Sequence, residues 1–203
     1  MVRLEHRREG SLALIGSFWY FICYSFLGFL LEVVFAKQSK AKKQDRKCRY
    51  FLPICPVYGF GALFFISLPS PIYRHPLLLF CLGIIIASVT EFIIGVFYSQ
   101  VLRTSFWDYT KMSHHFQGQI CLPFSIAWGL LSIPLIYGLH PLVSTLVARI
   151  PLALFLPAFY LFLADTAFTM CLLRHFQTAE VLRWYRAKSR LMMRSPFYPS
   201  LPK

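Results

Sequence analysis

The chain has 203 residues, of which 57% are apolar and only 14% are charged, and its formal net charge is +13. Soluble globular domains carry nearer a quarter charged residues, so this composition excludes an ordinary soluble domain and indicates an integral membrane protein. The positive charge does not indicate a nucleic-acid partner, because the bases flank long apolar runs and no DNA- or RNA-recognition motif is present.

Five apolar runs predict an all-α fold, a polytopic helical membrane bundle with about five transmembrane helices. Runs of about 20 residues can cross a hydrocarbon core of about 30 Å, since a helix rises 1.5 Å per residue. The second run contains Pro53, Pro56, Gly59 and Gly61, which predict a broken or partly re-entrant helix. In chain order, the expected spans are residues 11–36, 51–68, 76–98, 120–139 and 151–173. We therefore expect one transmembrane domain over residues 1–173 and a basic tail over residues 174–203.

The segments between the runs are expected to be loops. Residues 37–49 should form a solvated basic loop, residues 103–119 a polar loop, and residues 140–150 a short segment after the fourth span. Within the fourth span, Ser125 and Gly129 are four residues apart, which predicts a close approach of a neighbouring helix. The six cysteines have no paired spacing, so we interpret them as reduced packing residues.

The distribution of bases predicts the orientation in the cell membrane. With five crossings, sixteen of the 21 Lys and Arg residues fall on the side of the carboxyl terminus and five on the side of the amino terminus. Because cytoplasmic segments carry the excess of Lys and Arg, we expect the carboxyl terminus inside and the amino terminus outside. Failure of the second run to cross would invert this assignment.

Three of the eight acids lie inside different apolar runs, namely Glu32, Glu91 and Asp165. A charged acid near the middle of a bilayer costs roughly 2.5–3.5 kcal/mol on insertion scales, so its presence needs a function or a structural partner. The predicted topology places all three in the cytoplasmic half of their helices, where they could share one depth. We expect them to form an intramembrane substrate-binding site for a cation, a proton or a cationic group.

Helical spacing supports an inward position for two of these acids. Small and polar residues share a face with Glu32 in the first span and with Glu91 in the third, whereas bulky residues interrupt the face that carries Asp165. The structural alternative is that each acid is protonated or hydrogen-bonded and only holds helices together.

Aromatic residues are expected to border the acids on the cytoplasmic side. We assign this role to Tyr58 and to the loop group Trp107, Asp108 and Tyr109, which would act as a gate. The structural alternative for the loop group is an aromatic belt at the membrane interface, with Asp108 capping a helix.

No enzymatic motif is present. The chain lacks the Gly-rich phosphate loop of ATPases, the Gly-x-Ser-x-Gly nucleophile turn and the His-Glu-x-x-His zinc pair, so we expect no catalysis and no cofactor. We also expect no metal site, because His114 and His115 match no metal-ligand spacing. Any ATPase that works with this chain would be a separate nucleotide-binding subunit.

Five short blocks of the sequence carry a family resemblance. They are YSFLGFLLE at residues 24–32, ICPVYGFGA at 54–62, EFIIG at 91–95, WDYT at 107–110 and GQICLPFSIAWGLL at 118–131. Together they resemble the bacterial ABC-transporter type IV membrane family, also called the CmpB-like permeases, which implies a polytopic permease with no established substrate. The chain departs from the family pattern at Tyr50, where a glycine is usual, at Ser99, where an acid is expected, and at Gln119, where an arginine is common.

These observations favour a transporter or permease component of the cell membrane, with Glu32, Glu91 and Asp165 as its acidic site. The alternative is a non-transporting membrane scaffold or regulator, whose basic loop and tail bind anionic lipid or a cytoplasmic partner. A membrane enzyme is the least favoured interpretation.

Overall fold

Helices make up 77% of the structure, which confirms the predicted all-α membrane fold. The computed structural model describes residues 2–38 and 48–182, with side chains described from residue 12 onward. In this part of the chain, strands are limited to one short antiparallel hairpin of β1 (His115–Phe116) and β2 (Ile120–Cys121). The predicted basic loop between residues 39 and 47, and the tail from residue 183, lie outside the described residues.

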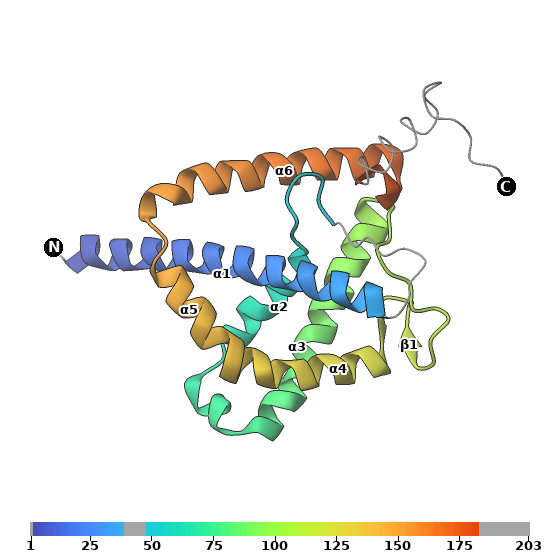
Figure 1. Cartoon of the computed structure of the whole chain (residues 1–203), viewed down its shortest axis with the longest axis horizontal. Coiled ribbons are helices and arrows are strands. Elements are labelled where there is room, and N and C mark those ends of the chain that lie inside the picture. The colour runs from blue at the N-terminus through green and yellow to red at the C-terminus, as the bar shows by residue number, and fades with distance from the viewer. Residues whose placement is uncertain (1, 39–47, 183–203) are drawn as a thin grey trace, which may run out of the picture.

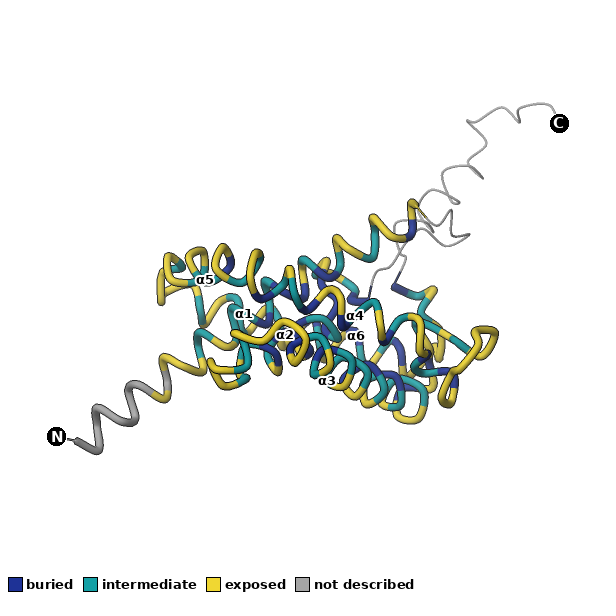
Figure 2. Tube along the Cα trace, turned by 90° about the horizontal axis from the view of Figure 1, so that it is seen from below, coloured by how far each residue is buried: buried dark blue, intermediate teal, exposed yellow. Residues whose placement is uncertain are grey.

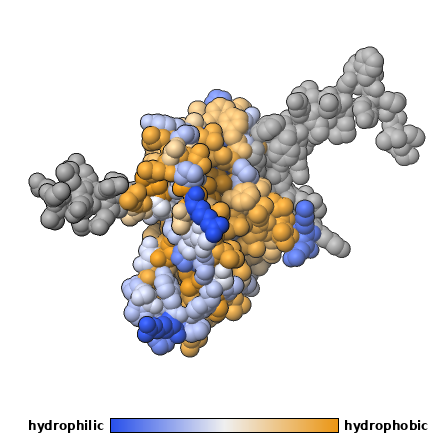
Figure 3. Space-filling model, turned by 60° about the vertical axis from the view of Figure 1, so that its left-hand side comes forward, coloured by the Kyte–Doolittle hydropathy of each residue, from blue (hydrophilic) through white to orange (hydrophobic). Residues whose placement is uncertain are grey.

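Four helical stretches of the described chain are long and apolar enough to cross a membrane, and they coincide with four of the five predicted spans. They are Leu12–Gln38, Pro76–Val101, Leu122–Ala148 and Leu152–Phe176. The first lies within α1 (Val2–Gln38), and the second consists of α3 (Pro76–Val96) and the wider π-helical turn η2 (Phe97–Val101). The last consists of the short turn η4 (Leu152–Leu154) and α6 (Phe155–Phe176). Hydrophobic side chains cover much of the face shown in Figure 3, as expected for a surface in contact with lipid.

The second predicted run is interrupted, as its prolines and glycines indicated. Only α2 (Pro56–Ile66) is helical, and its 11 residues extend about 16 Å, roughly half of a hydrocarbon core. The helix begins at Pro56 because a proline at the first helical position has no N–H to leave unpaired and has a φ angle suited to a helix. A short 3-10 turn, η1 (Ser70–Arg74), then leads into α3.

The boundary predicted after the fourth span is wrong. The helix does not end near residue 139, because α4 (Leu122–Pro134) continues through the π-helical turn η3 (Leu135–Leu139) into α5 (His140–Ala148). Pro134 cannot donate a backbone hydrogen bond, and the wider turn that follows absorbs this break without ending the helix. Figure 1 shows α5 continuing from α4 at an angle.

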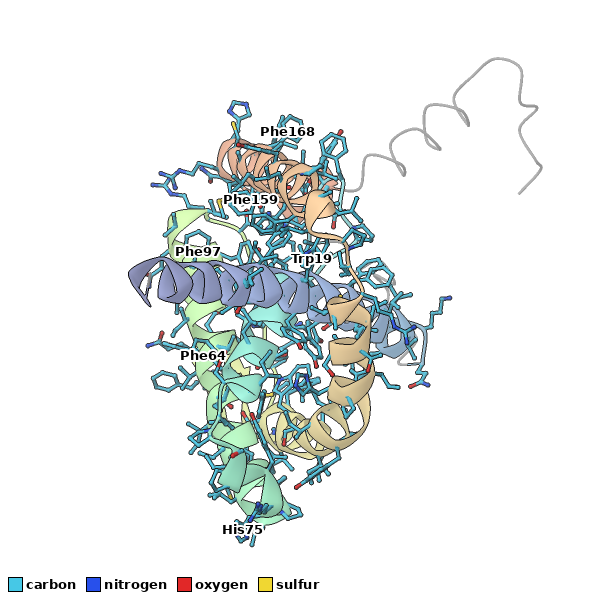
Figure 4. All side chains as sticks on the ribbon, turned by 90° about the vertical axis from the view of Figure 1, so that its left-hand side faces the viewer. Trp19, Phe64, His75, Phe97, Phe159 and Phe168 are labelled. Atoms are coloured by element: carbon cyan, nitrogen blue, oxygen red, sulfur yellow. The ribbon has the colours of Figure 1, made fainter. Side chains whose placement is uncertain are left out.

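Helices α1 and α6 are parallel, and α4 is antiparallel to both (Figure 1). The α1–α6 contact is aromatic, because the ring of Phe18 packs edge-on against three rings of α6, those of Phe155, Phe159 and Phe162. In Figures 1 and 4, α6 lies on one side of α1 and α4 on the other, while α3 crosses α1 so that its continuation η2 reaches the end of α6, where Arg174 donates a hydrogen bond of 2.7 Å to the carbonyl oxygen of Val101. The start of α1 and the end of α6 therefore lie at opposite ends of the bundle.

Small residues allow the remaining helices to pack closely, as predicted for Ser125 and Gly129. A Cβ atom added to Gly129 would lie 2.9 Å from the carbonyl oxygen of Phe80 on α3, and Ser88 of α3 donates a hydrogen bond of 2.7 Å to Ser125. Between α1 and α2, a Cβ atom added to Gly28 would lie 2.1 Å from Cγ of Tyr58. Buried residues accordingly gather in the middle of the bundle (Figure 2).

Candidate functional site

Glu91, in the carboxyl-terminal half of the apolar helix α3, is 6% exposed and is hydrogen-bonded on both carboxylate oxygens. Its Oε1 accepts a hydrogen bond of 2.8 Å from the phenol of Tyr109, and its Oε2 accepts one of 3.3 Å from Nε1 of Trp128. Tyr109 belongs to the loop after α3, and Trp128 belongs to α4. The carboxylate therefore joins three separate parts of the chain.

Glu32 lies near the end of α1 and borders the same aromatic group. Its Oε1 accepts a hydrogen bond of 2.7 Å from the phenol of Tyr58 on α2. The ring of Tyr58 packs edge-on against the ring of Trp128, with 5.3 Å between the centroids. Glu32 and Glu91 are thus connected through two aromatic residues, and α1, α2, α3 and α4 each supply one member.

Tyr58 reaches this position because α1 has no side chain at residue 28. Gly28 lies one helical turn before Glu32, and the Tyr58 ring occupies the space where a Cβ of residue 28 would be. The small-residue face predicted for α1 therefore serves to admit an aromatic ring beside the acid.

The loop that carries Tyr109 is held by its own backbone. Tyr109 donates its N–H to the carbonyl oxygen of Gly118 at 2.9 Å, and Gly118 has a φ of +68°, a conformation that favours glycine. Nε1 of Trp107 donates to the carbonyl oxygen of Gln119 at 2.9 Å. The Tyr109 ring stacks on Phe124 at the start of α4, with 5.0 Å between centroids. These contacts aim the phenol at Glu91.

Asp108 and Trp107 shape this loop and make no described contact with Glu32 or Glu91. Oδ1 of Asp108 accepts the N–H of Thr110 at 2.9 Å, so Asp108 closes a turn in the loop rather than capping a helix. This hydrogen bond holds the pKa of the exposed Asp108 carboxyl below its usual range. Of the predicted loop group, only Tyr109 reaches an acid.

The phenol of Tyr109 stays protonated at physiological pH. Burial raises its pKa above the ordinary value of 10, and the neighbouring Glu91 raises it further through its charge and its hydrogen bond. Tyr109 is therefore a neutral hydrogen-bond donor to Glu91 and adds no negative charge beside it.

Asp165 belongs to a second polar group, built on α6. Asp165 is 1% exposed, and its Oδ1 accepts the backbone N–H of Phe51 at 2.8 Å. One turn later, Thr169 accepts the backbone N–H of Tyr50 at 3.1 Å, and Arg49 donates to the hydroxyl of Thr166 at 2.5 Å. The described contacts of Asp165 are thus with the segment before α2, and none of them is with Glu32 or Glu91.

The segment before α2, residues 48–55, reaches the middle of the bundle. Cys55 donates its N–H to the carbonyl oxygen of Ser25, the central residue of the apolar stretch Leu12–Gln38. Asp165 is close to the centre of Leu152–Phe176. The chain therefore returns between α1 and α6 to about mid-depth, from where the short α2 continues (Figure 1).

Trp128 is the member of the acidic site that sequence reasoning missed. It lies three residues after Ser125 and one before Gly129, on the face that was expected to pack against a neighbouring helix. Its place on this helix-packing face is the sequence feature that could have identified Trp128 as a site residue.

The side chains at the family departures Ser99 and Gln119 lie against neighbouring backbone. Ser99 donates to the carbonyl oxygen of Val96 in its own helix at 3.1 Å. The side-chain oxygen of Gln119 lies against Gly95, 2.1 Å from where a Cβ of that residue would be. These two residues therefore do not rebuild a charge pair in the described structure.

Fold and site together define a polytopic α-helical membrane protein that holds acidic side chains among its apolar helices. Residues 19–170 match the sequence model of the family described as "Putative ABC-transporter type IV". The match spans most of the chain, so the protein belongs to this family, as the sequence blocks indicated. Comparisons with curated proteins and with solved structures find no match.

Proposed function

We propose that the protein is the membrane-spanning permease component of a transporter, and that Glu32 and Glu91 bind a proton or a small cation on its pathway. The observation that carries this proposal is the arrangement of Glu32, Tyr58, Trp128 and Glu91, in which four helices each contribute one side chain. A displacement of any of these helices would change the surroundings of both acids.

The cost of placing these acids in apolar helices supports a functional role. An acid that only joined two helices could be replaced by a neutral polar residue at lower cost of insertion. Here two acids border one aromatic group, and the donors described for them, Tyr58, Tyr109 and Trp128, are neutral. Because no described base pairs with Glu91, its ionised carboxylate adds negative charge to the site, which favours a proton or a cation.

We assign different roles to the other predicted site residues. Tyr109 would act as the gate, because it belongs to a loop and reaches Glu91 from outside the helices. Trp107 and Asp108 would hold that loop in shape. Asp165 would position residues 48–55 rather than bind the ligand, because its described partner is a backbone N–H.

The family description implies an energy source outside this chain. The sequence has no phosphate-binding loop, so we propose a separate nucleotide-binding subunit as the partner. The expected cytoplasmic segments, which carry most of the bases, would form its docking side.

Thermal unfolding of the purified chain in nanodiscs tests the site. A ligand that binds only the folded state raises the unfolding temperature as its concentration rises. We expect Na⁺, K⁺ or a small organic cation to raise it in the wild type, and Glu91→Gln or Glu32→Gln to abolish the response. If only pH moves the unfolding temperature, the ligand is a proton.

The matched control is Glu180→Gln, which removes an exposed acid after α6. It should respond to cations and pH as the wild type does. Equal responses of the wild type, Glu32→Gln and Glu91→Gln would contradict the proposed site.

A further inference from the structure

Cys48 and Cys55, at the two ends of the segment before α2, have their sulfur atoms 3.1 Å apart. Both are buried, with exposures of 8% and 5%. Neither the family description nor the proposed acidic site assigns a role to this pair. The contact is unexpected from the sequence, in which six residues separate the two cysteines.

The contact between the sulfur atoms is fixed from both ends of the segment. Cys55 is held by its backbone hydrogen bond of 2.8 Å to Ser25 and by the start of α2 directly after it. Next to Cys48, Arg49 is held by Thr166 and by the Phe162 ring, which lies 5.1 Å from its guanidinium carbon. Two helices, α1 and α6, therefore keep the two thiols together.

The surroundings favour disulfide chemistry over metal binding. Among the described residues, no group of three His, Cys, Asp or Glu side chains gathers to hold a metal ion. The distance between the sulfurs is about 1 Å longer than a disulfide bond of 2.03–2.05 Å, so a small shift would allow the bond to form. We propose that Cys48 and Cys55 are a redox-active dithiol, which a small neutral peroxide closes into an intramolecular disulfide.

The reaction balances with hydrogen peroxide as the oxidant. One sulfur attacks a peroxide oxygen, the O–O bond breaks, and the products are a sulfenic acid and one water. The second sulfur then attacks the sulfenic sulfur, the S–O bond breaks, the S–S bond forms, and a second water leaves. The two thiols lose two protons and two electrons in total, and these reduce the peroxide to two waters. Because both sulfurs are buried, an oxidoreductase protein could not reach them, and the oxidant has to be a small molecule.

The disulfide would act on the segment that contacts α6. It would close a ring that contains Phe51, whose N–H binds Asp165, and Tyr50, whose N–H binds Thr169. Oxidation would therefore add a covalent ring to a segment that hydrogen bonds already hold against α6, and reduction would leave the hydrogen bonds alone to hold it.

Peptide mass analysis of the full chain in nanodiscs tests the proposal. The chain is treated with hydrogen peroxide, and the remaining thiols are then alkylated in denaturant before digestion with trypsin. Trypsin cleaves after Lys47, Arg49 and Arg74, so the two cysteines leave in different peptides. We expect the Cys48–Arg49 dipeptide linked to the peptide of residues 50–74, with about tenfold more of this link than of any other pairing. Reduction should return both peptides in alkylated form.

Two controls separate this result from general oxidation. Peroxide treatment of the chain unfolded in urea should give mixed pairings among the six cysteines. In folded Cys55→Ser, Cys48 should pass to the sulfinic and sulfonic acids instead of forming a link. The proposal would be overturned if the folded wild type gave no link between the two peptides, or gave it no more often than other pairings.

Discussion

The phenol of Tyr109, in a loop outside the helices, donates a hydrogen bond of 2.8 Å to the carboxylate of Glu91 inside α3. This contact connects a loop with an acid that is buried among apolar helices. Under the proposed function, a change in the charge of Glu91 would reach the loop through this hydrogen bond. Loops of this kind commonly gate access to a site.

The pH dependence of stability should report on Tyr109. Between pH 10 and its raised pKa in the folded state, the unfolded chain loses the phenol proton while the folded chain keeps it. The unfolded state then binds fewer protons, so stability falls as pH rises above 10. We expect a smaller loss in Tyr109→Phe, measured as unfolding free energy in detergent from pH 8 to pH 11. Identical slopes in both proteins would contradict the burial of this phenol.

Two glycines of α2 provide a matched pair for testing its packing. A Cβ atom added to Gly59 would lie 2.2 Å from Oγ of Ser25 and 2.8 Å from the carbonyl oxygen of Phe21, whereas one added to Gly61 would have no atom within 4 Å. We expect Gly59→Ala to destabilise the protein by about 1–3 kcal/mol through overpacking. Gly61→Ala should be neutral or stabilising by up to about 1 kcal/mol. Thermal unfolding in one detergent, with both variants side by side, checks the difference, and equal losses would contradict the described α1–α2 contact.

Substitutions of Asp165 distinguish positioning from ligand binding. Asp165→Asn keeps an oxygen that can accept the Phe51 N–H, so it should retain most of the stability and the response to cations. Asp165→Leu leaves that N–H buried without an acceptor, which should cost about 1–3 kcal/mol of unfolding free energy. Loss of the cation response in Asp165→Asn, with normal stability, would show that Asp165 belongs to the ligand site.

A reporter fused after Lys203 tests the predicted orientation. The excess of bases predicts a cytoplasmic carboxyl terminus, so green fluorescent protein should fluoresce there and alkaline phosphatase should be inactive. Active phosphatase with a dark fluorescent protein would invert the orientation. A tag ahead of Met1, accessible from outside the cell, would support an odd number of crossings.

Much of the fold could be predicted from the sequence because bilayer thickness sets the length of a spanning run. The spans around Glu32, Glu91 and Asp165 follow from apolar runs, and the interruption of the second run follows from Pro56 and its neighbouring glycines. The end of the fourth span was misplaced, since a proline such as Pro134 can end a helix or be absorbed in a wider turn. Local sequence does not decide between these outcomes.

The sequence by itself determined that this protein lies in a membrane, that four of its apolar runs form helices long enough to cross it, and that three acids lie among apolar residues. Only the tertiary structure decided which residues meet: Trp128 beside Glu91, the Phe51 backbone beside Asp165, and the sulfur of Cys48 beside that of Cys55. Hydrophobicity fixes the depth of a helix in the membrane, because this depth depends on the contact of each single residue with lipid or water. The rotation of each helix and the path of an irregular segment depend on packing between parts that are distant in the chain, such as Gly28 against the Tyr58 ring.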